Sequence, residues 1–485
     1  MPLRCQENAV QENKHATDAP AALAPAGPWY RGLTGYHWFV LIVCSLGWAF
    51  DTMDQQLFNL ARTPALTDLL GAGATKADVD SCGRYATAIL ILGWATGGLI
   101  FGMLGDRWGR AKTMLLAIVV YSAFTGLSAF STSWQDFTLY RFLTGLGVGG
   151  EFAAGVSLVA EVMPARARPH ALGALMALSA FGNMAAAGIS FILKPQGEIA
   201  GVAGWRLLFL VGVLPALLVV LVMRRIKEPE GWLKAKEALA RNPDSREARK
   251  AMGSFRELFG DARWRRHAIV GVILATAGVM GLWGVGFWSP ELVRNHVLRG
   301  ETKEVQDWYA SMAFFIQQAG AFFGIFAFSV LTSLVGRRPA LAVSIVAGLV
   351  CVIGVFGFMT EPSQIWWMCP LLGFATLMIF GGYSIYFPEL FPTRLRSTGV
   401  GLCYKAARYL SVALLFLSAI VLSLFAAPAG SARAQEGLSG LTVLSSLGSV
   451  DDPFRYAAIA IASIYLVGLL ALPLAPETRG KPLPE

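Results

Sequence analysis

Charged residues are scarce in this sequence. Only 15% of its 485 residues are Asp, Glu, Lys or Arg, whereas 55% are hydrophobic, and the mean hydropathy is +0.54. Soluble domains average about 25% charged residues, so this composition excludes an ordinary soluble globular protein. We expect most of the chain to lie in a lipid bilayer.

Cysteine is also sparse and follows no metal-binding or disulfide pattern. The six cysteines include no CxxC pair, and Cys44, Cys351, Cys369 and Cys403 lie inside apolar runs, where small buried thiols are ordinary. We therefore expect no disulfide framework, no metal site and no cofactor. The N-terminus lacks the charged start and apolar core of a signal peptide, so residues 1–34 are predicted to form a disordered cytoplasmic tail.

The net charge of +9 does not indicate a nucleic-acid partner, because the basic residues form no single patch. They lie in short loops between apolar runs of about 20 residues, the length that crosses a bilayer. Twelve spans are predicted, at 36–58, 84–104, 112–131, 136–161, 170–193, 205–224, 267–289, 308–332, 339–359, 364–388, 398–426 and 454–474. Lys and Arg are concentrated in the loops after the even-numbered spans, which places those loops and both termini in the cytoplasm.

The two sets of six spans repeat one another. AEVMPARARPHALGAL at 160–175 matches PELFPTRLRSTGVGL at 388–402, and DRWGRAKTM at 106–114 matches SLVGRRPAL at 333–341, with offsets of 228 and 227 residues. A repeated six-span half is a common transporter plan, with the substrate site between the halves.

The predicted fold is therefore an all-α membrane protein of twelve transmembrane helices in two six-helix bundles. The bundles are expected at 35–225 and 267–475. A cytoplasmic linker with amphipathic helices is expected at 226–266, and a short cytoplasmic tail at 476–485.

Seven short motifs occur at the loops of this plan. In chain order they are GMLGDRWGRAK, YRFLTGLGVGGEFAAG, AEVMPARAR, KEPEGWLKAKE, GRRPA, YFPELFPTRLRSTG and PETRGKPLPE. Together, over spans 1 to 12, they resemble the major facilitator superfamily, in its sugar-porter-like and metabolite:proton symporter branches. The chain is similar there to the aromatic acid and sialate-type acid symporters. The resemblance implies a transporter and not an enzyme, and the sequence contains no metal-ligand cluster, nucleophile motif or phosphate loop.

Charged residues in these motifs are candidates for a cytoplasmic gate. They are Asp106, Arg107, Arg110, Glu161, Arg168, Arg337, Arg338, Glu389 and Arg396. Ion pairs that exist in only one conformation bias the equilibrium between inward-facing and outward-facing states, and the resemblance implies this role. Positive-inside topology and helix capping are the alternative. Because Ser333 stands where the second copy would repeat Asp106, we expect the gate to be asymmetric.

Span 1 carries two aspartates in an otherwise apolar run, at Asp51 and Asp54. Intramembrane charges usually pair or face a wet cavity. At about 1.5 Å per residue, Asp51 and Arg141 both lie roughly 10 Å below the outer membrane edge, so we predict an Asp51–Arg141 pair. The resemblance implies that Asp51 carries a coupled proton and that Arg141 is its partner. Asp54 shares the helix face and is a second titrating group or a substrate contact; a structural ion pair is the alternative for both acids.

Span 11 places Lys405 and Arg408 one helical turn apart, with Arg408 near the middle of the membrane. A guanidinium binds a carboxylate bidentately, so Arg408 is predicted to bind a substrate carboxylate. Lys405 is a further candidate for binding the substrate, and extension of its side chain to the cytoplasm is the alternative. Pairing of Arg408 with Glu151 or a backbone carbonyl is the alternative, and Glu151 itself is either a relay or a pairing group.

Other residues near mid-depth are further candidates for substrate contacts. They are Asn183, Gln317, Gln318, Trp283 and Tyr383. Amides in spans also hydrogen-bond neighbouring helices, and aromatic rings there often only pack, so both roles stay open.

The favoured function is proton-coupled symport of a small organic acid by alternating access, performed by a monomer in the cell membrane. Its expected partners are the substrate, protons and the lipid bilayer. A neutral sugar or polyol is the alternative substrate. A non-transporting membrane sensor of the same fold is a different class, which needs no titrating pair.

Overall fold

The computed structural model describes residues 28–71, 73–214, 225–241, 252–425 and 453–484. The strands in this part of the chain are two short ones, and the rest of its regular structure is helical, as predicted. Nine helical segments within it are long and apolar enough to cross a membrane. In its described part, each of the twelve predicted spans contains one helix or consecutive helices. The end of span 6, residue 426 and most of the expected N-terminal tail lie outside the described residues.

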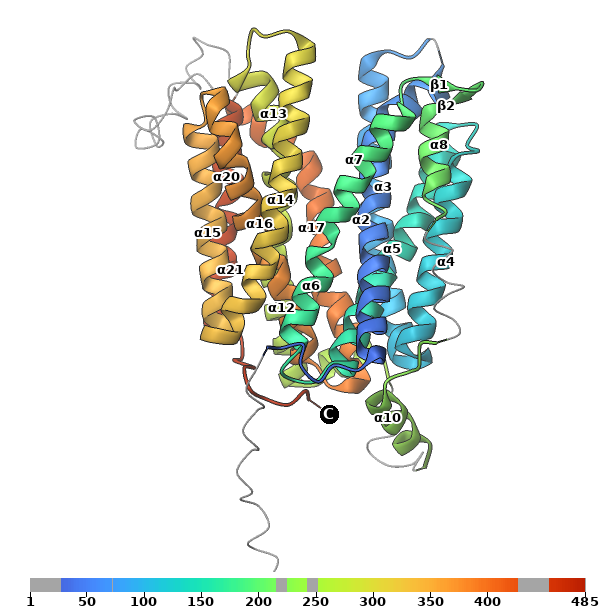
Figure 1. The fold of residues 1–485 in the computed structure, drawn as a ribbon, viewed down its shortest axis with the longest axis vertical. Helices are drawn as coiled ribbons and strands as arrows, with labels where there is room; N and C mark the ends of the chain where they lie inside the picture. The colour runs from blue at the N-terminus through green and yellow to red at the C-terminus, as the bar shows by residue number, and fades with distance from the viewer. Residues whose placement is uncertain (1–27, 72, 215–224, 242–251, 426–452, 485) are drawn as a thin grey trace, which may run out of the picture.

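The N-terminal half forms one bundle, coloured blue to green (Figure 1). Its helices are α2 (Gly35–Leu70), α3 (Lys76–Trp108), α4 (Arg110–Ser128), α5 (Trp134–Val162), α6 (Arg168–Ala177), α7 (Ser179–Leu193) and α8 (Gly204–Val211). An antiparallel hairpin of β1 (Glu198–Ile199) and β2 (Val202–Ala203), with Glu198 opposite Ala203, lies between α7 and α8.

The C-terminal half forms the second bundle, coloured yellow to red (Figure 1). Its elements are α12 (Ala262–Gly284), η1 (Gly286–Trp288), α13 (Ser289–Leu292), η2 (Val293–Val297), α14 (Lys303–Val335), α15 (Arg337–Phe358), η3 (Pro362–Gln364), α16 (Ile365–Leu390), η4 (Thr393–Leu395), α17 (Arg396–Phe425), α20 (Pro453–Ala462), α21 (Ile464–Ala471) and η5 (Leu472–Leu474). Two further helices, α10 (Glu230–Arg241) and α11 (Phe255–Gly260), lie between the halves in sequence, in the predicted linker.

The long axis of the molecule defines two faces. We call the end that carries α10 and the C-terminus the tail face, and the end that carries β1 and β2 the hairpin face (Figure 1). The halves approach each other toward the tail face, where α6 of the first half packs on α14 and α16 of the second, and where α17 packs on α3 and α5.

Backbone contact without side chains sets the spacing of α3 and α5. A Cβ atom on Gly97 would lie 2.0 Å from the carbonyl oxygen of Leu146, and one on Gly149 would lie 2.2 Å from that of Trp94. Only glycine allows helices to approach so closely. The glycine-rich face of α5 is therefore a packing surface, and it brings Glu151, which follows this run, into the interior of the bundle.

The sequence repeat is also a structural repeat at the tail face. Gly109 and Gly336 end α3 and α14 with φ angles of +119° and +100°, a region that favours glycine. In each turn a carboxylate caps the next helix. Glu228 accepts a hydrogen bond from the backbone N–H of Arg110 at 2.7 Å, and Glu477 accepts one from that of Arg337 at 2.9 Å.

Candidate functional site

A cavity lies between the two halves, lined from both. Its wall consists of Trp48, Thr52, Gln55, Gln56, Trp94, Met176, Ser179, Asn183, Leu282, Ile325, Leu377, Phe380, Tyr404 and Arg408. Aromatic rings and amides dominate this wall, and Arg408 is the charged residue among the described ones that line it. A cavity of this kind, apolar with a few polar groups, suits a small organic molecule.

Arg408 reaches the cavity wall as predicted from the sequence. Its guanidinium stacks 3.7 Å from the ring centre of Trp94 and 4.7 Å from that of Tyr404. Within the described residues it donates to the carbonyl oxygen of Tyr404 on its own helix. No ion pair of Arg408 with Glu151 is present in the described structure, so its remaining donors are available to a bound anion.

Lys405 does not extend to the tail face. Its side chain is fully buried, and its ammonium lies 4.8 Å from the ring centre of Trp94 and 5.2 Å from that of Phe152. The ammonium has no hydrogen-bond partner among the described residues. Space for it comes from α3, because a Cβ on Gly98 would lie 2.1 Å from Cγ of Lys405.

Two carboxylates share this buried region. Asp51 and Glu151 are each 1% exposed, and none of their four oxygens accepts a hydrogen bond within the described part of the chain. Both acids interact electrostatically with Lys405. We call Asp51, Glu151, Lys405 and Arg408 the central cluster. Buried charged groups are normally hydrogen-bonded, so these unsatisfied groups are unusual.

The predicted Asp51–Arg141 pair is wrong in this conformation. Arg141 pairs instead with Asp54, whose carboxylate lies 3.7 Å away and also accepts a 2.7 Å hydrogen bond from Thr125. Arg141 further donates to Ser128 at 2.6 Å. The predicted depth of Arg141 in the membrane differs from that of its observed partner by less than one helical turn. However, α2 directs Asp54 and not Asp51 toward α4 and α5, which supply these partners. Asp54 is therefore the structurally paired acid of the two.

The other predicted substrate residues separate into two groups. Asn183 lines the cavity. The Gln317 amide is occupied by Ser289 and by the carbonyl of Gly286, where span 7 is interrupted, and the Tyr383 hydroxyl donates to the carbonyl of Leu274 at 2.6 Å. Both therefore serve helix packing, the alternative role. Gln318 is buried outside the cavity wall, and the side chain of Trp283 lies outside the described residues.

Several wall residues were not predicted. Trp48, Thr52 and Gln55 on α2 follow an i, i+4, i+7 spacing, so they share one face of the helix. That spacing next to Asp51 was a usable signal in the sequence. Trp94 and Tyr404 carried no such signal, because their part in the site depends on how α3 meets α17.

A second set of buried charges joins the halves at the tail face. Asp106, at the end of α3, accepts hydrogen bonds from the backbone N–H groups of Ser397 and Thr398 at 3.1 and 2.8 Å. The Thr398 hydroxyl adds a third, at 2.6 Å. Since α17 begins at Arg396, this carboxylate sits at a helix N-terminus, where backbone donors and the helix dipole favour an anion.

Glu161 bridges two arginines from different halves. Its Oε1 accepts hydrogen bonds from Arg110 at 3.0 Å and from Arg396 at 2.8 Å. Arg110 also pairs with Asp106 at 3.0 Å and donates to the carbonyl of Thr393. We call Asp106, Arg110, Glu161 and Arg396 the tail-face cluster. All four are predicted gate residues, and the structure brings them together.

The remaining gate candidates form the second copy of this arrangement. Arg337 binds Glu389 at 2.7 Å, as Arg110 binds Glu161, and Arg168 donates to the carbonyl of Ala160 at 2.7 Å, as Arg396 does to that of Pro388. Arg338 donates to the carbonyl of Pro473 and Arg107 to that of Met252, so neither belongs to the tail-face cluster.

The copies differ as expected at the position of Asp106. Its counterpart Ser333 donates only to carbonyls of its own helix. The repeat also places Pro169 opposite Ser397, and proline has no N–H to offer a carboxylate. Both partners of the interaction are thus missing in the second copy.

Part of the predicted N-terminal tail is ordered against this face. The ring of Trp29 stacks on His170 of α6 at 5.5 Å. The predicted linker helices also pack here. Trp232 of α10 donates to the carbonyl of Asp106 at 2.7 Å, and Glu257 of α11 pairs with Arg394 at 2.8 Å.

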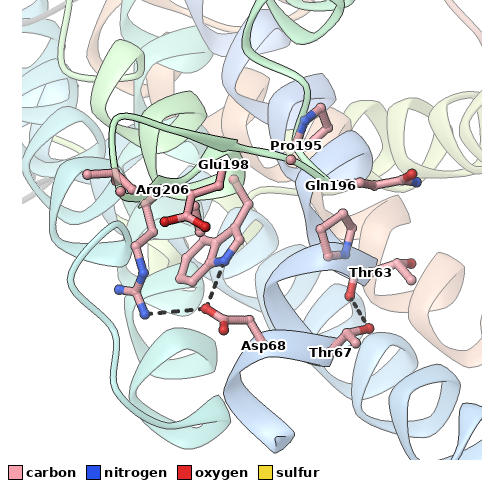
Figure 2. A pocket seen from close by; sticks show the side chains of 13 residues that line it. Thr63, Thr67, Asp68, Pro195, Gln196, Glu198 and Arg206 are labelled. Carbon is pink, nitrogen blue, oxygen red and sulfur yellow. Dashed lines mark hydrogen bonds and ion pairs between the residues drawn. The ribbon is translucent and has the colours of Figure 1, made fainter. Parts of the chain in front are cut away.

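A separate pocket opens on the hairpin face. Figure 2 shows Asp68 of α2 beside Arg206, with the β1–β2 hairpin above them. Asp68 accepts a hydrogen bond from the Trp205 indole at 3.1 Å and lies 3.6 Å from Arg206. Its side chain is half exposed, and its charge is paired. This pocket lacks the buried, unsatisfied groups of the central cluster.

Comparison with known proteins agrees with this geometry. A probable 4-methylmuconolactone transporter of Cupriavidus pinatubonensis is 28% identical over 93% of this chain and 93% of its own length. The sialic acid transporter NanX of Escherichia coli is 26% identical over 75% of this chain and 83% of its own. The solved proton:xylose symporter XylE superposes with a TM-score of 0.72 at 18% identity, over 92% and 98% of the two chains, and so shares the fold.

The sequence profile of one family covers most of the chain. It matches residues 44–416, which run from within α2 to within α17. The resemblance seen in the motifs is thus confirmed, as is the expectation of a transporter and not an enzyme. The chain belongs to the Major Facilitator Superfamily of membrane transporters.

Proposed function

We propose that this transporter carries a small organic acid together with protons. The observation that carries the proposal is the central cluster, in which buried carboxylates without hydrogen-bond partners lie next to a cavity with an arginine in its wall. Groups of this kind inside a membrane are usually functional. Arg408 is the proposed anchor for a substrate carboxylate, since its planar fork matches that group.

The tail face is proposed to be cytoplasmic and the protein to be a monomer of the cell membrane. The concentration of Lys and Arg in tail-face loops supports this orientation. In that orientation the tail-face cluster closes the cytoplasmic side, and the conformation described here is outward-facing. We further propose two transport domains, 35–225 and 267–475, which move relative to each other around the cavity.

The proposed cycle couples a proton to this movement. A substrate anion at Arg408 adds negative charge to the central cluster. Asp51 then takes up a proton, because burial without a full partner disfavours the ionised form. Neutralisation makes closure of the hairpin side less costly, and separation of the tail-face cluster opens the cytoplasmic side. Asp54 remains paired with Arg141 and holds α2 against α4 and α5.

The names of the relatives support an acid as the substrate. They are described as transporters of muconolactone, cis,cis-muconate, niacin and sialic acid. The likeness to a xylose symporter concerns the fold alone, and fold does not decide the substrate. A sugar would also leave the donors of Arg408 without an anionic partner.

The test is uptake into proteoliposomes that contain the purified protein. Labelled benzoate, nicotinate, cis,cis-muconate, sialic acid and xylose would be offered with and without an inward proton gradient. We expect one or more acids to accumulate only with the gradient. Asp51→Asn should abolish this accumulation but still exchange internal for external acid, since exchange requires no net proton release. Asp68→Asn, a paired carboxylate at the far end of the same helix, is the matched control and should behave as wild type.

Two results would contradict the proposal. Uptake of xylose without a gradient would make the protein a sugar uniporter and would leave Asp51 a structural residue. Full gradient-driven accumulation of acid by the Asp51→Asn variant would assign the coupled proton to another group.

A further inference from the structure

We propose that Glu151 is a second proton-binding group of the transport cycle, which receives its proton from Asp51 and allows a dicarboxylate to be carried with two protons. This inference rests on the proposed function and deepens it. Proton-coupled symport as proposed above requires only Asp51. The position and surroundings of Glu151 carry the additional step.

The carboxylate of Glu151 lies against α2, about one turn from Asp51. A Cβ atom on Gly47 would lie 2.6 Å from Oε1 of Glu151. Gly47 and Asp51 are four residues apart and therefore share a helix face, with about 5–6 Å between such positions. Because α2 begins at the tail face, Glu151 is the deeper of the two acids, on the tail-face side of Asp51.

No described group neutralises Glu151 by direct contact. Among the described residues, Glu151 has no ion pair within 4 Å and no hydrogen bond, although only 1% of the residue is exposed. The other acid near the membrane centre, Asp54, has both kinds of partner. A buried carboxylate that lacks a close partner gains by binding a proton, so Glu151 is placed to accept one.

The titratable groups that face Glu151 come from three helices. Asp51 and Cys44 lie on α2, Tyr121 lies on α4, and Lys405 lies on α17. Lys405 is shared, because it interacts with both Asp51 and Glu151. A single ammonium stabilises one ionised carboxylate better than it stabilises two at the same time. When one of the two acids binds a proton, Lys405 therefore pairs more strongly with the other.

Charge balance connects this arrangement to the substrate. Fully ionised, the central cluster has two negative and two positive groups and is neutral. A monocarboxylate at Arg408 adds one negative charge, which one proton on Asp51 cancels. A dicarboxylate adds two, and cancelling the second requires a proton on Glu151. The Asp54–Arg141 pair is neutral by itself and contributes to neither case.

The transfer itself is a simple proton exchange. The proton leaves the carboxylic acid of Asp51, which becomes a carboxylate, and Glu151 becomes the carboxylic acid. The phenol of Tyr121 interacts electrostatically with both acids, so it belongs to the same buried region. Asp51 can then accept a second proton from the hairpin side.

The first test needs no substrate. Infrared difference spectra of the full-length protein in lipid nanodiscs, recorded between acidic and alkaline buffers, report the C=O stretch of protonated carboxyl groups. We expect Glu151→Gln and Asp51→Asn each to lower the buried carboxyl band, to which the buried Asp54 and Asp106 also contribute, because the two acids titrate as a pair. Glu361→Gln, an exposed glutamate in a loop, should leave this band unchanged. A wild-type band in Glu151→Gln would overturn the inference, since Glu151 would then stay ionised.

The second test counts protons in proteoliposomes. With cis,cis-muconate, wild type should take up about two protons per molecule and Glu151→Gln about one. With benzoate, wild type should take up about one and Glu151→Gln fewer, because the variant cluster starts with one negative charge less. If wild type couples protons but Glu151→Gln keeps its stoichiometry, this inference fails alone. If wild type couples no protons to either acid, the proposed function fails and this inference with it.

Discussion

The central cluster and the tail-face cluster both bury two acids and two bases, but they satisfy them differently. In the tail-face cluster each charged group makes at least one hydrogen bond, although Oε2 of Glu161 has no partner among the described residues. Asp106 alone accepts three hydrogen bonds from α17. In the central cluster, Asp51, Glu151 and Lys405 have no hydrogen bond within the described structure. Buried charge that is fully paired holds two parts together, whereas buried charge that is not paired is available to a ligand or a proton.

This difference assigns the two clusters to different steps. The bonds of Asp106 to α17 and of Glu161 to Arg396 cross between the halves, so they exist only while that side is closed. The central groups lie beside the cavity and change their balance when substrate or a proton arrives. Substitutions in the tail-face cluster should therefore alter the populations of the conformations. Substitutions in the central cluster should alter substrate binding and proton coupling.

The largest expected effect is that of Arg408→Ala on acid uptake. Removing one partner of a buried charge interaction costs about 2–5 kcal/mol, so apparent affinity for the transported acid should fall about 30-fold or more. Arg408→Lys retains the charge but loses the planar fork, and should be intermediate. Arg294→Ala removes an exposed arginine paired with Asp307 and serves as the control. Unchanged concentration dependence of uptake in Arg408→Ala would remove Arg408 from the site.

A smaller effect, on conformation, is expected for Asp106→Asn. Hydrogen bonds to charged groups contribute about 1.5–3 kcal/mol each, so the tail-closed population should fall about tenfold or more. Spin labels at Trp108 and Leu334, exposed positions on the two halves, would report a longer distance at the tail face. Asp136→Asn is the control, because Asp136 caps α5 within one half. An unchanged distance distribution would show that the tail-face cluster does not hold the closed state.

Gly98→Ala should disturb the central cluster from a distance. The new methyl group would collide with the stem of Lys405, and overpacking of this kind costs about 1–3 kcal/mol. We expect a lower unfolding temperature and reduced proton-driven uptake, with the tail-face distance unchanged. Gly188→Ala on α7, where a Cβ meets nothing within 4 Å, is the matched control. Equal behaviour of the two variants would mean that the position of Lys405 is not set by α3.

The smallest effect is expected at Glu477, a carboxylate whose hydrogen-bond donors all come from the second half. Burial alone would raise its pKa, but backbone N–H donors of Arg337, Arg338, Arg479 and Thr478 outweigh burial and hold the pKa below its usual value. Its stabilisation is therefore present above the unfolded pKa of about 4.3 and is lost as the pH falls through the lower folded value.

The measurement for Glu477 is thermal unfolding at several pH values. Glu477→Gln should cost about 0.5–2 kcal/mol at neutral pH, as loss of a helix cap does. The difference from wild type should shrink in acid. Glu228→Gln, the equivalent cap in the first half, should cost a similar amount. A loss of proton coupling in either variant would contradict the division between the two clusters.

The sequence was most informative about features that a single short segment of the chain determines. Apolar runs of span length, interrupted by basic loops, predicted the helices, and the offset between repeated motifs predicted two similar halves. The pairing of Glu161 and Glu389 with arginines of the neighbouring motifs was also predictable, because each motif sits at a helix end on one face. Hydrophobic length and local capping are properties of the chain alone.

The orientation of each helix about its own axis, which decides the direction of its side chains, was less predictable. Asp51 and Asp54 differ by less than one turn, and only the packing of α2 against α4 and α5 decided that Asp54 meets Arg141 and Asp51 does not. The aromatic rings around Lys405 likewise include Trp48 of α2, Trp94 of α3 and Phe152 of α5, which are far from Lys405 in sequence.

By itself, the sequence determined the membrane-embedded helices, the two-fold repeat and the identities of the charges that must lie in lipid. Transfer of each residue from water depends on its own chemistry. The tertiary structure alone decided which of those charges are paired and which are left open beside the cavity, because hydrogen bonds and ion pairs depend on ångström-scale distances between helices that no local pattern encodes.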